Sequence, residues 1–377
     1  MTTAPTERAG VAGSGVVVVK IGTSSLTEGS GAIDAGAVAK VCADIAEVRG
    51  KGRPVVLVTS GAIAAGLPVI GLDGGRPADS ATLQAASAVG QSRLLGHYDR
   101  ALATHELVGG QILLSPNDFF DRRRYLQARR TLGVLLDLGV VPIVNENDAV
   151  ADDEIRFGDN DRLAALVAHL VGAETLVLLT DTAGLLSADP RHGAPASLIE
   201  EVVEVDHQLE ALAGGPGSAR GSGGMASKLA SAKMASWSGV RAVIAAAARP
   251  RVLVDAVEGV AGVGTVVVPR PRRLPARKLW IAFAVGARGT LTVDAGARAA
   301  LVERGVSLLP AGVVGVAGAF GAGDAVEVAG PGGEVFAKGL VSQAAAVVQR
   351  WAGRRSQALP DDLDPEVIHR DDLVLLP

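Results

Sequence analysis

Short runs of Val, Ile and Leu recur along the chain and alternate with longer segments in which apolar residues follow the period of a helix. The runs lack the apolar–polar alternation of a half-exposed strand, so they predict strands buried on both faces by crossover helices. We predict strands at 16–21, 54–59, 111–114, 141–144, 175–179, 243–246 and 264–268, and helices at 34–48, 83–104, 124–138 and 161–171. This order predicts an α/β fold, namely an αβα sandwich with a mainly parallel sheet.

Polar residues stand at the carboxyl ends of four predicted strands. They are Lys20, Gly22 and Thr23 at the end of the first, Ser60 and Gly61 at the end of the second, Thr180 and Asp181 at the end of the fifth, and the stretch NENDAVADDEIRFGDND at the end of the fourth. Solvated turns and helix N-caps use the same residue types. Ligands of open parallel sheets bind outside the carboxyl ends of the strands, however, and polar ends on this many strands favour a ligand cleft.

A glycine-rich turn leads directly into a predicted helix at 221–239, which reads GSGGMASKLASAKMASWSG. The glycines allow backbone N–H groups to approach a phosphate, the helix N-terminus adds positive potential, and Lys228 adds a full charge. The spacing differs from that of the GxxxxGK[ST] phosphate loop. Glycine–serine runs are also typical of flexible linkers. Lys20, at a separate strand end, offers a second cation for the same phosphates.

Length and composition limit the classes of protein that fit. The chain has 377 residues, enough for two domains, with 48% hydrophobic residues, 3% aromatic residues and 48 glycines. A net charge of -4 gives no overall attraction to nucleic acid or to an anionic membrane. Cys42 is the single cysteine, which excludes an intrachain disulfide and a multi-cysteine metal site. Neither a signal peptide nor a membrane helix is evident, so we expect a cytoplasmic protein.

Two lysines, glycine turns and a carboxylate cluster fit phosphoryl transfer, in which positioning and charge stabilisation provide most of the catalysis. An alcohol acceptor would need a base to remove its proton. A carboxylate acceptor, with a reference pKa of about 4.3 for a glutamate side chain, is already an anion at neutral pH. The lysines would then hold two anions together.

Six segments in order, VVVVKIGTSSL, VVLVTSGAI, VPIVNENDAV, FGDND, LLTDTAGL and GSGGMASK, resemble the glutamate 5-kinase family. They cover about residues 16–268. The resemblance implies the amino-acid-kinase αβα sandwich. It also implies ATP-dependent phosphorylation of the γ-carboxylate of L-glutamate to L-glutamyl 5-phosphate, the step that opens proline biosynthesis. The glycine turn departs from the usual GTGGM of this family, because Ser222 replaces threonine and keeps only the hydroxyl.

Matching these motifs residue by residue implies three groups of site residues. Glutamate is expected at Ser60, Asp148 and Asn160, where Asp148 suits the substrate ammonium and the other two suit its carboxylates. The transferred phosphoryl group is expected between Lys20 and Lys228, with Asp161 orienting both lysines. ATP is expected at Lys20, Thr180, Asp181, Ser222, Gly223, Gly224, Met225, Ala226, Ser227 and Lys228. Mg²⁺ is expected mainly on nucleotide oxygens, since it keeps several waters and uses few carboxylates.

The composition changes after VVVPRPRRLPARKLW, where Pro269, Pro271 and Pro275 predict a stiff linker. We predict a flexible N-terminus at 1–14, a kinase domain at 15–268, a linker at 269–275, and a small β-barrel-like domain with an acidic tail at 276–377. The segment GAFGAGDAVEV of the last domain resembles a PUA domain, a module that binds RNA in other proteins. Residues 276–355 hold nine basic against five acidic residues, and 356–377 reverse this with one against six. That balance favours an accessory or assembly role over RNA binding.

Alternatives within the same chemistry are kinases of acetylglutamate or aspartate, and a different class would be an RNA-binding protein that uses the PUA domain. Asp148 is the residue that discriminates among these kinases, because a substrate with a free ammonium group needs an acidic side chain as its partner. The family resemblance further implies feedback by proline, a homo-oligomer, and delivery of product to the next enzyme of proline biosynthesis. The arginine run at Arg122, Arg123, Arg124, Arg129 and Arg130 predicts a solvated face or a subunit contact.

Overall fold

The computed structural model describes residues 15–28, 32–72, 77–115, 117–150, 160–188, 196–214, 224–271, 273–283, 285–355, 360 and 364–376. Internal contacts divide the chain into two compact units, Met1–Arg273 and Leu274–Pro377, hereafter unit 1 and unit 2. The predicted flexible segment 1–14 lies outside the described residues.

Unit 1 is built on an eight-stranded sheet with the order β3-β4-β2-β1-β5-β7-β8-β6. The strands are β1 (Val17–Ile21), β2 (Val55–Thr59), β3 (Gly109–Leu114), β4 (Val141–Glu146), β5 (Thr175–Thr180), β6 (Glu201–Val202), β7 (Arg241–Ala246) and β8 (Gly264–Val267). All neighbouring strands are parallel except β7 and β8. The mainly parallel sheet predicted from the apolar runs is therefore confirmed, and β6, only two residues long, is the strand that the pattern missed.

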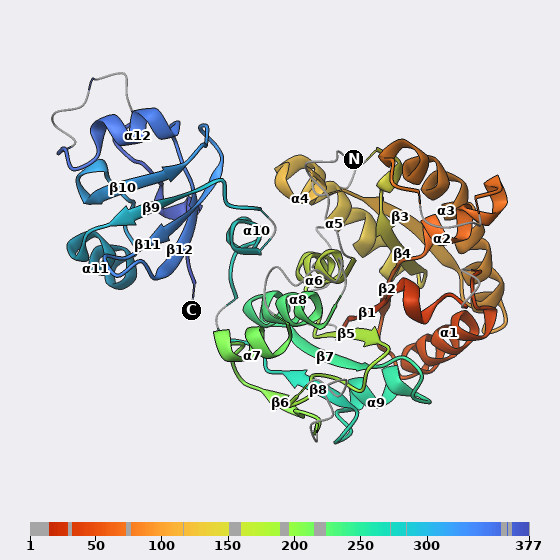
Figure 1. Cartoon of the computed structure of the whole chain (residues 1–377). Helices are drawn as coiled ribbons and strands as arrows, with labels where there is room; N and C mark the ends of the chain where they lie inside the picture. Colours follow the sequence, from red (N-terminus) through yellow and green to blue (C-terminus); the bar gives the residue numbers. More distant parts are fainter. Residues whose placement is uncertain are drawn as a thin grey trace, which may run out of the picture. The chain divides into compact units, whose positions relative to one another are not determined.

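Helices cover both faces of this sheet (Figure 1). They are α1 (Ala35–Gly50), α2 (Ala62–Gly66), α3 (Ser80–Ala103), α4 (Asn117–Phe120), α5 (Arg122–Asp137), α6 (Asn160–Val171), α7 (His207–Leu212), α8 (Met225–Trp237) and α9 (Val252–Glu258). Apolar residues of α1, α3 and α9 form one buried cluster with the odd-numbered valines of β1, whereas α6 and α8 pack on the opposite face. This is the expected αβα sandwich.

Aspartates define where several of these helices begin. Asp34 caps α1 by accepting hydrogen bonds from Gly36 N and Ala37 N, at 2.8 and 3.0 Å. Asp79 accepts from Thr82 N at 2.8 Å, so α3 begins at Ser80, three residues before the predicted start. Asp121 likewise caps α5. An N-cap acceptor pairs with an N–H group of the first turn that has no intrahelical partner, which explains these boundaries.

Strand β4 continues through Glu146, two residues beyond its predicted end at Val144. Asn145 and Glu146 are part of the strand and are buried, with exposed fractions of 3% and 6%. The predicted end was wrong because polar residues were taken as the start of a loop. A buried polar side chain in a central strand must find hydrogen-bond partners from other elements, and those partners lie at the candidate site.

Unit 2 contains a five-stranded sheet with the order β10-β9-β11-β12-β13. Its strands are β9 (Gly289–Val293), β10 (Val313–Gly318), β11 (Ala325–Ala329), β12 (Val335–Leu340) and β13 (Leu373–Leu375), and its helices are α10 (Ala276–Phe283), α11 (Ala295–Arg304) and α12 (Ala345–Trp351). Among these five described strands, β9 and β11 form the one parallel pair. Leu291, Val328 and Phe336 belong to its own apolar core. The small β unit expected after the proline-rich segment is present.

The segment after β8 packs on the carboxyl end of α8. Arg270 N donates to Ser236 O at 2.9 Å, and Ser236 Oγ donates to Val268 O at 2.6 Å. The Arg270 guanidinium lies over the ring of Trp237, 4.2 Å from its centroid. The first residues of the predicted 269–275 linker are thus bonded to unit 1.

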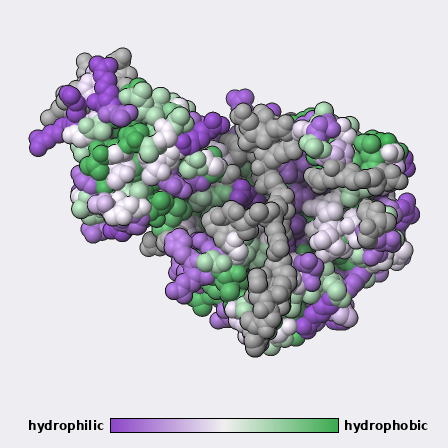
Figure 2. Space-filling view, in the orientation of Figure 1, coloured by the Kyte–Doolittle hydropathy of each residue, from purple (hydrophilic) through white to green (hydrophobic). Residues whose placement is uncertain are grey.

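Among the described residues, no helix combines the length and the apolar character needed to cross a bilayer. Figure 2 shows hydrophilic and hydrophobic residues interspersed over the visible face of each unit. The run of five arginines between positions 122 and 130 lies in the first turns of α5, and all five side chains are exposed. Arg124 is within 3.5 Å of Asp118, a distance that fits a solvated ion pair.

Candidate active site

A buried carboxylate joins two lysines at the centre of unit 1. Asp161 Oδ1 lies 2.5 Å from Lys20 Nζ, and its Oδ2 lies 2.9 Å from Lys228 Nζ. Lys20 comes from the central strand β1, Asp161 from the first turn of α6, and Lys228 from the first turn of α8. Their exposed fractions are 3%, 0% and 6%. The structure therefore brings together the three residues that the sequence assigned to phosphoryl transfer.

Burial makes this cluster costly, because each ion loses its hydration and only part of that free energy is recovered by pairing. Two ammonium groups share one carboxylate, so the three side chains carry a net positive charge. A positive centre of low solvent exposure attracts anions more strongly than the same charges at the surface. The arrangement suits a phosphate group that is bound between the two lysines.

Gly224 is the N-cap of helix α8, has extended backbone (φ -74°, ψ -175°) and makes no side-chain capping bond. A 13-residue helix directs its N-terminal N–H groups and the positive end of its dipole toward this point. Met225, Ala226 and Ser227 are half-buried in the first turn, beside Lys228. Ser222 and Gly223, which the sequence also assigned to ATP, lie outside the described residues.

Strand β5 brings Thr180 and Asp181 to the same edge of the sheet. Lys20 pairs in register with Leu178 of β5, so the end of that strand lies next to the end of β1. Thr180 is buried and donates from Oγ1 to Asp181 Oδ1 at 3.0 Å, while Asp181 is exposed. An exposed carboxylate with one bonded oxygen remains accessible to a nucleotide.

Ser60 and Asn160, assigned to the substrate, are in direct contact. Asn160 Nδ2 donates to Ser60 Oγ at 2.8 Å and to Thr59 O at 2.6 Å. The turn that presents Ser60 depends on Gly61, whose φ of +100° is a conformation that residues with a Cβ rarely adopt. Asp148, the third predicted substrate residue, lies in the 3₁₀ turn Asp148–Val150 just after β4.

Two residues of α3 reach the same region, and sequence reasoning missed both. Ser87 donates from Oγ to Asp148 Oδ2 at 3.2 Å. Gln91, one turn later, contacts Asn145 and the carbonyl of Glu146 at 3.2 and 3.3 Å. Both side chains are buried, with exposed fractions of 0% and 7%. The available signal was their four-residue spacing on the face that also carries Leu83 and Leu94, since polar residues on the apolar stripe of a helix require buried partners.

Two other titratable side chains on this side of the sheet support the fold. Burial raises the pKa of the Cys42 thiol to about 12, so it packs as a small apolar group, as its position among apolar residues predicted. Burial also raises the pKa of Tyr98. The Tyr98 hydroxyl lies 2.7 Å from Thr59 Oγ1 and anchors the end of β2 next to Ser60.

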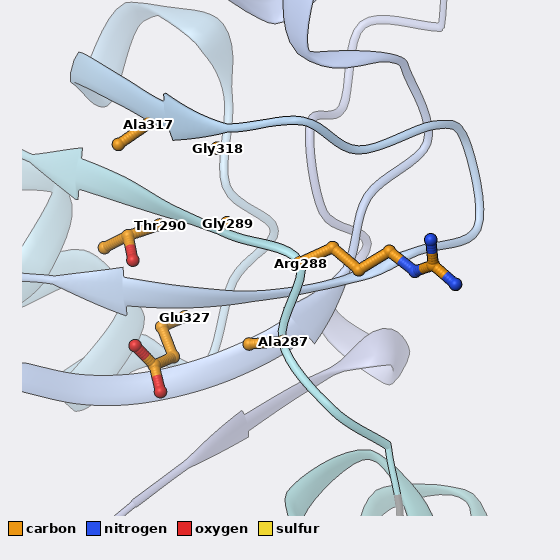
Figure 3. A pocket seen from close by; sticks show the side chains of 7 residues that line it. All are labelled: Ala287, Arg288, Gly289, Thr290, Ala317, Gly318 and Glu327. Atoms are coloured by element: carbon orange, nitrogen blue, oxygen red, sulfur yellow. The ribbon is translucent and has the colours of Figure 1, made fainter. Parts of the chain in front are cut away.

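Unit 2 has a separate shallow pocket of about 420 Å³ (Figure 3). Glycine and alanine form much of its wall, and its charged residues are Arg288 and Glu327. In Figure 3 the Arg288 side chain points away from Thr290 and Glu327. The pocket is lined by one basic and one acidic side chain, so the formal charges of its lining residues cancel.

Comparisons with known proteins agree with this geometry. The model of the Amino acid kinase family matches residues 15–246, and that of the PUA domain matches residues 289–361. A protein named Glutamate 5-kinase from Burkholderia ambifaria is 45% identical over 370 residues, covering 97% of this chain and 99% of its own length. A second protein named Glutamate 5-kinase, from Mycobacterium avium, is 48% identical over 361 residues, covering 95% of this chain and 96% of its own length.

The family resemblance inferred from the six motifs is thus confirmed over nearly the whole chain. The chain belongs to the amino acid kinase family, in its glutamate 5-kinase group, and carries a C-terminal PUA domain.

Proposed function

We propose that this protein transfers the γ-phosphoryl group of ATP to the side-chain carboxylate of L-glutamate and so forms L-glutamyl 5-phosphate, which opens proline biosynthesis. The main support is the high identity to proteins named Glutamate 5-kinase over almost the full length of both chains. The buried Lys20–Asp161–Lys228 cluster supplies the charges that such a transfer needs. An ATP-dependent enzyme of amino-acid biosynthesis fits the cytoplasm, and we propose this compartment for the protein.

The chemistry requires positioning rather than a base. The glutamate side chain, with a reference pKa of about 4.3, reaches the site as a carboxylate and can attack phosphorus without losing a proton. Lys20 and Lys228 would each contact oxygens of the transferred phosphoryl group and reduce the repulsion between the two anions. Asp161 holds both ammonium groups in place before substrate arrives. The N-terminus of α8 would bind the remaining phosphate oxygens.

Mg²⁺ is proposed as the ion that accompanies ATP and neutralises phosphate charge. Among the described residues, no group of three or more His, Cys, Asp or Glu side chains is placed to hold a metal ion. We propose that phosphate oxygens and water supply most ligands of the Mg²⁺, with the exposed Asp181 as a protein oxygen.

The activity can be tested by trapping the acyl phosphate with hydroxylamine while ATP consumption is followed. We expect a hydroxamate with L-glutamate and at most traces with N-acetylglutamate or aspartate. Efficient trapping with either competitor and not with glutamate would contradict the proposal. The kinase comparisons do not favour an RNA-binding function. Proline feedback, a homo-oligomer, and transfer of product to the next enzyme stay predictions of the family resemblance.

An Asp148→Asn variant should bind glutamate more weakly and ATP normally. The amide keeps the shape of the side chain but removes the charged acceptor for the substrate ammonium. A lost hydrogen bond to a charged group, about 1.5–3 kcal/mol, predicts a rise in KM for glutamate of roughly 10- to 150-fold. Steady-state kinetics with each substrate varied in turn measure this.

Asp121→Asn is the matched control for that variant, because it removes an exposed carboxylate at the cap of α5. Its glutamate KM should be that of the natural protein. If Asp148→Asn instead raises the KM for ATP and leaves glutamate unchanged, the two subsites have been assigned in reverse.

A shortened chain that ends at Arg273 should still phosphorylate glutamate. Every residue assigned to ATP, glutamate and the lysine cluster lies in unit 1, which has its own core. Because a domain with its own core folds alone, we expect turnover within about fivefold of the full chain. The hydroxamate assay on folded protein measures this.

Ending the chain at Val268 instead removes the contacts of Arg270 with Ser236 and Trp237. That version should be less stable by roughly 1–2 kcal/mol, the sum expected for one hydrogen bond and one cation–π contact. A folded 1–273 chain that binds ATP but forms no hydroxamate would show that unit 2 completes the active site.

A further inference from the structure

Three side-chain amides form a continuous chain from helix α3 to the first turn of α6. Gln91 Oε1 accepts from Asn145 Nδ2 at 3.2 Å, and Asn145 Oδ1 accepts from Asn160 Nδ2 at 2.8 Å. Gln111 Nε2 of β3 donates to the same Gln91 oxygen at 3.2 Å. All donors in this chain point in one direction, from Asn160 toward Gln91.

Backbone groups set the orientation of each amide. Gln91 Nε2 donates to Glu146 O at 3.3 Å, Asn145 Oδ1 accepts from Glu146 N at 2.9 Å, and Asn160 Nδ2 donates to Thr59 O at 2.6 Å. A carbonyl oxygen only accepts and a backbone N–H only donates. Rotating any one of the amides by 180° would therefore place two acceptors or two donors against each other.

This orientation leaves Asn160 with an unused acceptor. Its Nδ2 has two hydrogens and lies within 2.8 Å of three acceptors, Thr59 O, Ser60 Oγ and Asn145 Oδ1. Its Oδ1 is buried and, among the residues that the structure describes, has no hydrogen-bond partner. A buried carbonyl oxygen without a donor costs about 1–3 kcal/mol, which a ligand N–H group can recover. Asn160 thus has an oxygen, and no free N–H, to offer a ligand.

Helix α3 is well placed to hold this orientation, because its backbone is in direct contact with α2. A Cβ on Gly90 would lie 1.7 Å from Ala62 O, and a Cβ on Gly66 would lie 1.9 Å from Ala86 O. Two helices with glycine at their contact approach more closely than side chains would allow. The same helix supports Asp148 through Ser87, so two acceptors of the substrate site depend on it.

We propose that Gln91 is a positioning residue for the glutamate site: through Asn145 it makes Asn160 present Oδ1 to the substrate ammonium. The proposal rests on the proposed function and changes one part of it, since the sequence had assigned Asn160 to the substrate carboxylates. Asn160 Oδ1 and Asp148 then form an acceptor pair that selects a protonated amine. Glutarate, which is glutamate without its amino group, has nothing to donate to that pair.

The test compares glutamate with glutarate in a Gln91→Met variant of the full chain. Methionine keeps the length of the side chain and removes both hydrogen-bonding groups. We expect the preference for glutamate over glutarate, measured as the ratio of the two kcat/KM values, to fall by about tenfold or more. That fold-change corresponds to the loss of one hydrogen bond to a charged group. The KM for ATP should change less than twofold.

Leu94→Val is the matched control, because Leu94 is buried on the same helix and takes no part in the amide chain. It should lower the thermal midpoint and leave the glutamate-to-glutarate ratio unchanged. A purely structural role of Gln91 would give both variants the same result. In that case the proposal is wrong.

A Gln91→Glu variant gives an independent test if the methionine variant does not fold. A protonated carboxyl group has one donor and one acceptor and can replace the amide, whereas a carboxylate would repel Glu146 O. The glutamate-to-glutarate ratio of this variant should therefore rise as pH falls from 8 to 6, relative to the natural protein. A ratio that equals the natural value at every pH would overturn the proposal. Failure of the natural protein to phosphorylate glutamate at all would instead refute the proposed function.

Discussion

Lys228→Ala should lower turnover with glutamate by about a hundredfold or more in a protein that remains folded. The expected loss is that of a single preorganised group that stabilises developing charge, which costs about 10²–10³ in kcat. Lys228 is buried, paired with Asp161 at 2.9 Å, and placed in the first turn of α8, where a phosphate would bind. The measurement is kcat at saturating ATP and glutamate.

Lys233 offers a matched control on the same helix. Its side chain is also mostly buried and also paired with a carboxylate, at 2.7 Å from Glu210. A Lys233→Ala variant removes a buried, paired ammonium and should cost stability while turnover stays within about fivefold, since it stabilises no transferred group. Equal losses of turnover in both variants would mean that Lys228 acts through the packing of α8 and not on the phosphoryl group.

Asp161→Asn should abolish measurable turnover and also destabilise unit 1. Removing the carboxylate leaves two buried ammonium groups facing a neutral amide, and breaking a buried ion pair in this way costs about 3–5 kcal/mol. Both Asp161 oxygens are within 2.9 Å of a lysine, so each ammonium group loses this carboxylate. Urea unfolding followed by circular dichroism measures the loss of stability.

A triple variant separates the two effects. Combining Asp161→Asn with Lys20→Met and Lys228→Met removes all three charges and fills the space with apolar chains of similar length, so most of the lost stability should return. Turnover should not return. If Asp161→Asn alone is as stable as the natural protein, the carboxylate does not balance the two lysines and its assigned role is wrong.

The sheet of unit 1 was predictable because each central strand is buried on both faces. β1, with Lys20 as the one charged residue in an apolar run, shows why the same pattern also reveals the site. β6 and α9 escaped prediction for a different reason, since two and seven residues are too few to display a period. Short elements form because the tertiary structure holds them in place, not because of local preference.

The site was predictable in its residue types and not in its contacts. Lys20 is unusual in its local sequence as the one charged residue of an apolar strand, and motif matching was enough to group it with Asp161 and Lys228. Ser87 and Gln91 carried a weaker mark, because only their position on the apolar face of α3, beside Leu83 and Leu94, distinguishes them from polar residues of a surface helix. Their importance comes from partners 54 to 61 positions away in sequence, and such contacts follow from packing rather than from spacing.

The central place of β1 has a consequence for how the chain is made. Its two neighbours are β2, which follows soon after, and β5, which begins only at Thr175. Until the ribosome has released β5, one edge of an almost wholly apolar strand has no partner, and unpaired apolar edges associate with other chains. A strand that is fully buried in the finished protein is therefore exposed to aggregation for part of translation.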